Sequence, residues 1–167
     1  LYKIFSYVFL LFINLLFSPF ILTLSKDSHL NSSIIRVLGI DPGSNITGFS
    51  VVEQKSGKFC PIVWGIIDCR KEESYSDKLN KIFQGISEVI SEHSPTVLSI
   101  ENVFVSKNVN SALKLGQARG AAIVAAANKG LEVHEYSPLE IKQSVVGTGK
   151  AAKDQVNFLV KRLCKIK

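Results

Sequence analysis

Residues 37–53 read VLGIDPGSNITGFSVVE, and this stretch decides the fold. It continues an apolar run over 35–40 that is rich in branched side chains, as is typical of a central strand. The Pro-Gly dipeptide at 42–43 predicts a turn, because Pro fixes φ and Gly permits positive φ. The apolar residues at 48–52 predict a returning strand. The stretch therefore predicts a β-hairpin whose first strand ends in one carboxylate, Asp41.

A carboxylate at the end of a buried strand costs free energy unless it binds a metal ion or a partner. The alternative is an Asp that simply begins a turn, which is common for this residue. A second apolar strand, predicted over 96–101, also ends in a carboxylate, Glu101. If the two strands lie side by side with a helix crossing between them, Asp41 and Glu101 converge at one end of the sheet.

Carboxylates at close range repel each other unless one is protonated or a cation lies between them. Hard oxygen ligands favour Mg²⁺ or Mn²⁺, so Asp41 and Glu101 predict a site for one of these ions. Two such ions about 4 Å apart would suit in-line displacement at a phosphate. The alternative is that Glu101 only ends its strand.

The remaining segments predict two further strands and four helices. Their order along the chain indicates a mixed five-stranded α/β sheet flanked by helices. The segments are strands at 60–68 and 131–136, and helices at 77–93, 108–129, from 138 and at 151–163.

The 167 residues suffice for one domain with a full core, and the formal net charge is +6. Residues 34–100 hold seven Lys and Arg against eight Asp and Glu, whereas residues 101–167 hold eleven against five. The second half therefore predicts a phosphate-binding surface, with a solvated basic face as the alternative. The three cysteines form no CxxC motif, which predicts a reducing, cytoplasmic location.

Residues 1–33 form a hydrophobic N-terminal extension that is set apart from the fold. The apolar run at 4–24 has the length of a signal peptide or membrane anchor. The chain contains no Met, and this extension is dominated by residues whose codons are AT-rich. We therefore expect a non-native start and a working domain over 34–167.

Several motifs together resemble the RuvC family of Holliday-junction resolvases. They are Leu38–Ser44 with Thr47-Gly48, Ile100–Phe104, Lys107-Asn108, Ser111–Gly120, Val145–Gly147 with Gly149, and Gln155-Val156. The resemblance extends from about Ile35 to about Leu163. It implies an RNase H-like fold, a homodimer, and a Mg²⁺-dependent endonuclease that nicks four-way DNA junctions symmetrically in recombination and repair. A branch-migration helicase complex is an implied partner.

The resemblance also implies site residues. Asp41 and Glu101 match the first two catalytic metal ligands, and Phe104 matches an aromatic that stacks on junction bases. The alternative for Phe104 is a place in the core. Lys142 and Lys153 match lysines that contact the phosphate backbone. Independently of the resemblance, Lys150 ends a glycine loop at a helix start whose N–H groups suit a phosphate, and Lys107 is a further predicted DNA contact.

The chain departs from the family by ending at Lys167, before the helix that carries the last two metal-binding positions. Asp154 lies in a phosphate-contact segment and is not assigned as a ligand. We therefore expect an incomplete domain, a missing C-terminal helix and impaired cleavage. The alternatives are a junction-binding module without catalysis, a phosphotransferase of the actin and sugar-kinase type, and a membrane-anchored protein.

Overall fold

The computed structural model describes residues 34–55, 58–102, 108–137, 139–140 and 155. The elements are β1 (Ile35–Asp41), β2 (Ile46–Lys55), β3 (Lys58–Asp68), α3 (Tyr75–His93), β4 (Val97–Glu101), α4 (Val109–Asn128) and β5 (Glu132–Tyr136). All seven were predicted, with ends that differ by a few residues. The N-terminal extension, the glycine loop and nearly all of the last two predicted helices lie outside the described residues.

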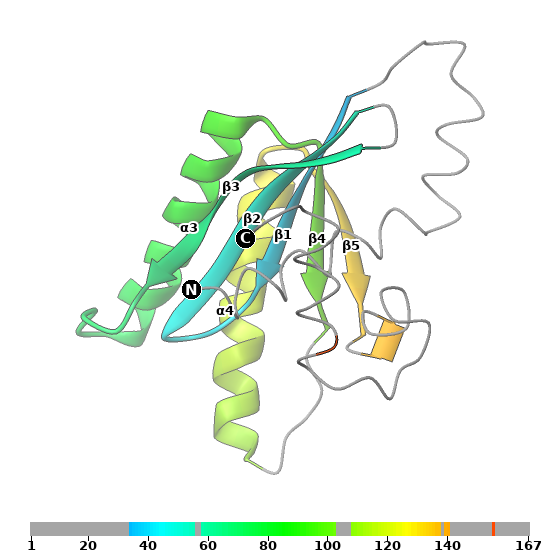
Figure 1. Ribbon diagram of the computed structural model, residues 1–167. Helices are drawn as coiled ribbons and strands as arrows, with labels where there is room; N and C mark the ends of the chain where they lie inside the picture. Colours follow the sequence, from blue (N-terminus) through cyan, green and yellow to red (C-terminus); the bar gives the residue numbers. More distant parts are fainter. Residues whose placement is uncertain (1–33, 56–57, 103–107, 138, 141–154, 156–167) are drawn as a thin grey trace.

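The strands form one five-stranded sheet in the order β3-β2-β1-β4-β5. β2 runs antiparallel to both β1 and β3, whereas β1, β4 and β5 are parallel. Their arrowheads lie at the same end of the sheet in Figure 1. The prediction that β1 and β4 lie side by side is therefore confirmed, with α3 as the crossover between them.

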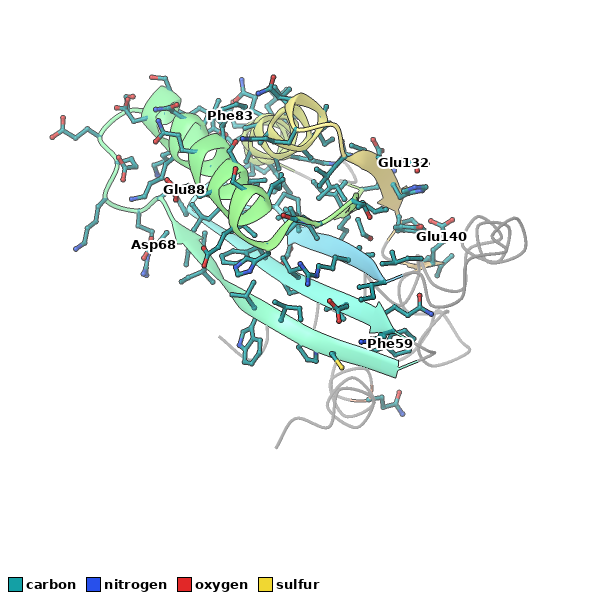
Figure 2. All side chains as sticks on the ribbon, turned by 90° about the horizontal axis from the view of Figure 1, so that it is seen from above. Phe59, Asp68, Phe83, Glu88, Glu132 and Glu140 are labelled. Atoms are coloured by element: carbon teal, nitrogen blue, oxygen red, sulfur yellow. The ribbon has the colours of Figure 1, made fainter. Side chains whose placement is uncertain are left out.

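Both helices cover the same face of the sheet, as Figure 2 shows from above. Side chains alternate between faces along a strand, so every second residue of the central strands points toward the helices. Leu38, Ile40, Leu98 and Ile100 do so and are fully buried in the main apolar cluster. The buried residues that α4 contributes to the cluster are all alanines, which let the helix lie close to the sheet: Ala118, Ala122, Ala125 and Ala126.

Helix α3 begins two residues earlier than the sequence predicted. Ser74 caps it by accepting from the Asp77 N–H, while the Asp77 side chain accepts from the Ser74 N–H. This capping box satisfies two backbone donors that a helix start otherwise leaves unpaired. The helix ends at His93, and its C-cap Ser94, with a φ of 50°, turns the chain away just before Pro95.

Within the described part of the chain, no helix is long and apolar enough to cross a bilayer.

Candidate active site

The two predicted carboxylates lie at the ends of neighbouring parallel strands. Ile40 of β1 is in register with Ile100 of β4, and Asp41 and Glu101 follow one step further along each strand. Because both isoleucines point into the helix-covered core, both carboxylates point to the opposite face. Neighbouring strands lie about 5 Å apart, so the two side chains start within reach of one ion. Both residues are half-buried.

Residues of the neighbouring strands flank the pair on that face. Gly48 of β2 is in register with Asp41, and Tyr136 of β5 is in register with Glu101. One row further into the sheet, the same face carries Ser50, Gly39 and Ser99. Beside the two carboxylates, this face therefore carries short strand side chains and one aromatic ring, that of Tyr136. Tyr136 was not singled out from the sequence, because its place depends on the register of β5.

The turn that follows Asp41 is held by hydrogen bonds within it and to neighbouring segments. The buried Thr47 hydroxyl donates to the Gly43 carbonyl at 2.8 Å and accepts from the Gly43 N–H at 3.3 Å. Asn45 accepts from the Cys69 N–H at 2.8 Å and from Lys78 Nζ at 2.7 Å. The direction in which the chain leaves Asp41 is therefore fixed.

The reason for glycine at position 43 differs from the sequence prediction. Among the described glycines, only Gly130 has a positive φ. A Cβ at Gly43 would instead overlap the carbonyl oxygen of Ile46. Space, rather than left-handed backbone freedom, makes this position a glycine.

Arg119 of α4 contacts the end of the strand that carries Glu101. Its Nε donates to the Glu101 carbonyl oxygen at 3.1 Å, and its Nη2 lies 2.6 Å from Oε2 of Glu135. The second contact is an ion pair rather than a well-aligned hydrogen bond. The side chain is only 16% exposed. In the sequence, Arg119 is one arginine within a segment rich in Gly and Ala, and this pattern alone assigns it no role.

A third strand-ending carboxylate, Asp68, lies at the same end of the sheet but two strands from Asp41. Figure 2 labels it at the end of β3. Arg70 holds it through two side-chain hydrogen bonds of 2.9 and 2.6 Å and one from its backbone N–H. These bonds hold the pKa of Asp68 well below its usual range. Its oxygens are committed to Arg70, so Asp68 is not a candidate ligand.

The predicted DNA-contacting residues lie outside the described part of the chain, and their roles stay predictions. They are Phe104, Lys107, Lys142, Lys150 and Lys153.

The donor set fits a hard divalent cation. Asp41 and Glu101 offer carboxylate oxygens from a shared face, and hard cations prefer such ligands. The described residues contain no group of three or more His, Cys, Asp or Glu that could hold an ion. The described part of the chain thus offers two candidate ligands, Asp41 and Glu101.

The sheet order, in which β2 alone runs against its neighbours, defines an RNase H-like α/β fold. A family model described as "Crossover junction endodeoxyribonuclease RuvC" matches residues 37–167. The chain belongs to this RuvC family of endodeoxyribonucleases, as the resemblance predicted.

Curated relatives with the same description support this membership. The protein from Tolumonas auensis is 55% identical over 130 residues, which cover 78% of this chain and 75% of the relative. That from Citrifermentans bemidjiense is 49% identical over 127 residues, with 76% and 77% coverage.

Solved structures agree in fold. The RuvC of T. thermophilus, described as in complex with a Holliday junction substrate, matches with a TM-score of 0.75 and 30% identity. The match covers 80% of this chain and 81% of that one. The yeast mitochondrial Holliday junction resolvase Ydc2 matches with a TM-score of 0.59 at 18% identity, which supports the fold alone.

Proposed function

We propose that this chain is a Holliday-junction resolvase, a divalent-metal-dependent endonuclease that nicks two strands of a four-way DNA junction symmetrically. The observation that carries the proposal is the placement of Asp41 and Glu101 at adjacent parallel strand ends in a member of the RuvC family. The family match over 37–167 supports a nuclease domain that begins near Ile34.

Asp41 and Glu101 are the proposed metal ligands. A bound divalent ion, with Mg²⁺ as the proposed ion, would polarise the phosphate and lower the pKa of the attacking water. The carboxylates set where the scissile phosphate is held, because each is anchored to a rigid strand. Gly48 flanks the proposed site beside Asp41, and Tyr136 flanks it beside Glu101.

The proposed junction contacts extend this site. Phe104 is the proposed stacking residue, and Lys107, Lys142, Lys150 and Lys153 are the proposed phosphate contacts. The excess of basic residues after position 100 supports this assignment. Because phosphate contacts release counterions, junction binding should weaken steeply as the salt concentration rises.

A homodimer is part of the proposal, because symmetric nicks require two sites. One face of α4 exposes Val109, Leu113 and Val124 by 64%, 61% and 58%. Gly116 and Gly120 lie on the same face, and a Cβ at either would have no heavy atom within 4 Å. Spacings of three and four residues form one stripe along a helix, on the side away from the buried alanines. An apolar stripe with two glycines suits close packing on the α4 of a second copy.

The dimer is tested by sedimentation of Leu113→Glu beside Lys114→Gln. Both changes alter the charge by one unit on exposed positions of α4, but only Leu113 lies on the apolar stripe. We expect a monomer for Leu113→Glu and a dimer for Lys114→Gln. A dimer in both would place the interface elsewhere.

The activity is tested with a synthetic four-way junction and a linear duplex of the same sequence, in Mg²⁺ and in EDTA. The variants are Asp41→Asn and Glu101→Gln, with Asp68→Asn as the matched control. We expect symmetric nicks only in the junction, only with Mg²⁺, and only in the wild type and the Asp68 variant. Junction binding without any nicks in the wild type would favour a binding module that lacks catalysis.

A further inference from the structure

The backbone carbonyl of Glu101 accepts a hydrogen bond from the Arg119 side chain, which approaches from the helix-covered face of the sheet. The Arg119 guanidinium lies on the helix-covered face, whereas the Glu101 carboxylate points to the opposite face. One arginine therefore contacts the main chain of the proposed metal ligand without entering the site. Its low exposure keeps water from competing for the contact.

The sequence after Asp41 explains why the Glu101 carbonyl needs such a donor. The Asn102 N–H donates to the Tyr136 carbonyl at 2.8 Å, so the backbone N–H of residue 102 points toward β5. Along a strand, the backbone N–H and C=O groups of successive residues point alternately to the two neighbouring strands. The Glu101 carbonyl therefore points toward β1. The β1 residue next in line there is Pro42, which has no N–H. Arg119 supplies a donor where the sheet cannot.

Glu135 fixes the orientation of the guanidinium. It lies on β5, with its side chain on the helix-covered face beside Arg119. The arginine thus connects α4 to the ends of β4 and β5 at once. Its planar fork can contact a carbonyl and a carboxylate together, which a lysine cannot do with the same geometry.

We propose that Arg119 is a positioning residue for the metal site, which holds Glu101 at the separation from Asp41 that lets both bind one ion. The inference rests on the proposed roles of Asp41 and Glu101. Groups that orient a metal ligand typically change metal affinity or activity by roughly 10- to 100-fold when they are removed.

The chain offers a closely matched control at the other end of the sheet. Arg36 Nε lies 2.9 Å from Oε2 of Glu53, and its Nη1 donates to the His93 carbonyl at 3.0 Å. Like Arg119, it bridges a strand carboxylate and a main-chain carbonyl. It lies near the start of β1, and Asp41 ends that strand. Loss of Arg36 therefore removes comparable contacts far from the site.

The experiment compares Arg119→Gln, Arg119→Lys and Glu135→Gln with Arg36→Gln. Three quantities are measured: the thermal midpoint, the Mn²⁺ concentration that half-saturates binding as followed by electron paramagnetic resonance, and junction affinity in EDTA. We expect Arg119→Gln and Arg36→Gln to lower the midpoint similarly. Only Arg119→Gln should raise the half-saturating Mn²⁺ concentration, by roughly 10-fold or more. Junction affinity in EDTA should stay within about twofold in all variants, because no phosphate contact is removed.

The milder variants keep the test decisive if Arg119→Gln does not fold. Glu135→Gln retains the bond to Glu101 but loses the ion pair, so its Mn²⁺ shift should be smaller than that of Arg119→Lys. Equal Mn²⁺ affinity in these variants, Arg36→Gln and the wild type would overturn the positioning role. Failure of the proposed function is separate, because it would appear as unchanged Mn²⁺ binding in Asp41→Asn.

Discussion

Replacement of Gly43 by Ala tests whether the turn after Asp41 positions that carboxylate. The new Cβ would overlap the carbonyl oxygen of Ile46, whereas ordinary contact begins at 3.4 Å. The obstructing atom belongs to the backbone, so no side-chain rotation relieves it. The turn has to open by on the order of 1 Å, against the Thr47 bonds that close it, and such overpacking typically costs about 1–3 kcal/mol. For a domain of this size, the melting midpoint should fall by roughly 2–12 °C.

The cleavage rate should fall by more than the loss of stability alone explains, because the turn opens next to a proposed metal ligand. A displacement of about 1 Å in a reacting group can lower the rate on the order of 100-fold. The assays are thermal unfolding and single-turnover junction cleavage. Gly85→Ala is the control: its Cβ would lie 2.9 Å from the flexible end of Ile67, in the helix-covered core and on the face opposite to the Asp41 carboxylate. Alanine also favours the helix by up to about 1 kcal/mol, so this variant should stay stable and active.

Two results would refute this reasoning. Wild-type stability in Gly43→Ala would show that the turn has room for a methyl group. Reduced stability with an unchanged cleavage rate would show that the turn does not determine the placement of Asp41.

Three further predictions concern the rest of the fold. Ser74→Ala removes the cap of α3 and should lower the free energy of unfolding by about 1 kcal/mol in urea titrations; an unchanged midpoint would contradict the capping box. Bonds from Arg70 lower the pKa of Asp68, so the stabilisation is present at neutral pH and is lost as the pH falls below about 4. The difference in stability between wild type and Asp68→Asn should therefore shrink toward pH 2, and a constant difference would argue against the pair. Burial raises the pKa of the Cys69 thiol, so an alkylating agent should modify exposed Cys60 first and Cys69 only on unfolding, as mass spectrometry would detect.

The sequence was sufficient to predict the strands and the position of Asp41 and Glu101 at neighbouring strand ends. The apolar runs that end at Asp41 and Glu101 identify buried strands, and the amphipathic segment between them identifies a crossover helix. Parallel strands joined by such a helix usually lie side by side, so their ends meet. That inference requires only local patterns and one rule of topology.

The remaining parts of the site depend on register and packing. Tyr136 reaches the site only because β5 pairs with β4 at Glu101, and five residues of β5 carry too little pattern to predict this pairing. Arg119 lies in a helix of small residues, and nothing in its local sequence shows that Glu135 is its partner. Gly43 was correctly placed in a turn but for the wrong physical reason, because a steric approach between residues 43 and 46 cannot be seen in a sequence.

The most direct test of the central claim measures Mn²⁺ binding by electron paramagnetic resonance in the wild type, Asp41→Asn, Glu101→Gln and the double variant. If both carboxylates hold the same ion, each single change should weaken binding at least about tenfold, and the double change should not equal the sum of the two free-energy losses. Asp68→Asn should bind Mn²⁺ as the wild type does. Unchanged binding in either single variant, or strictly additive losses, would contradict a shared metal site at the ends of β1 and β4.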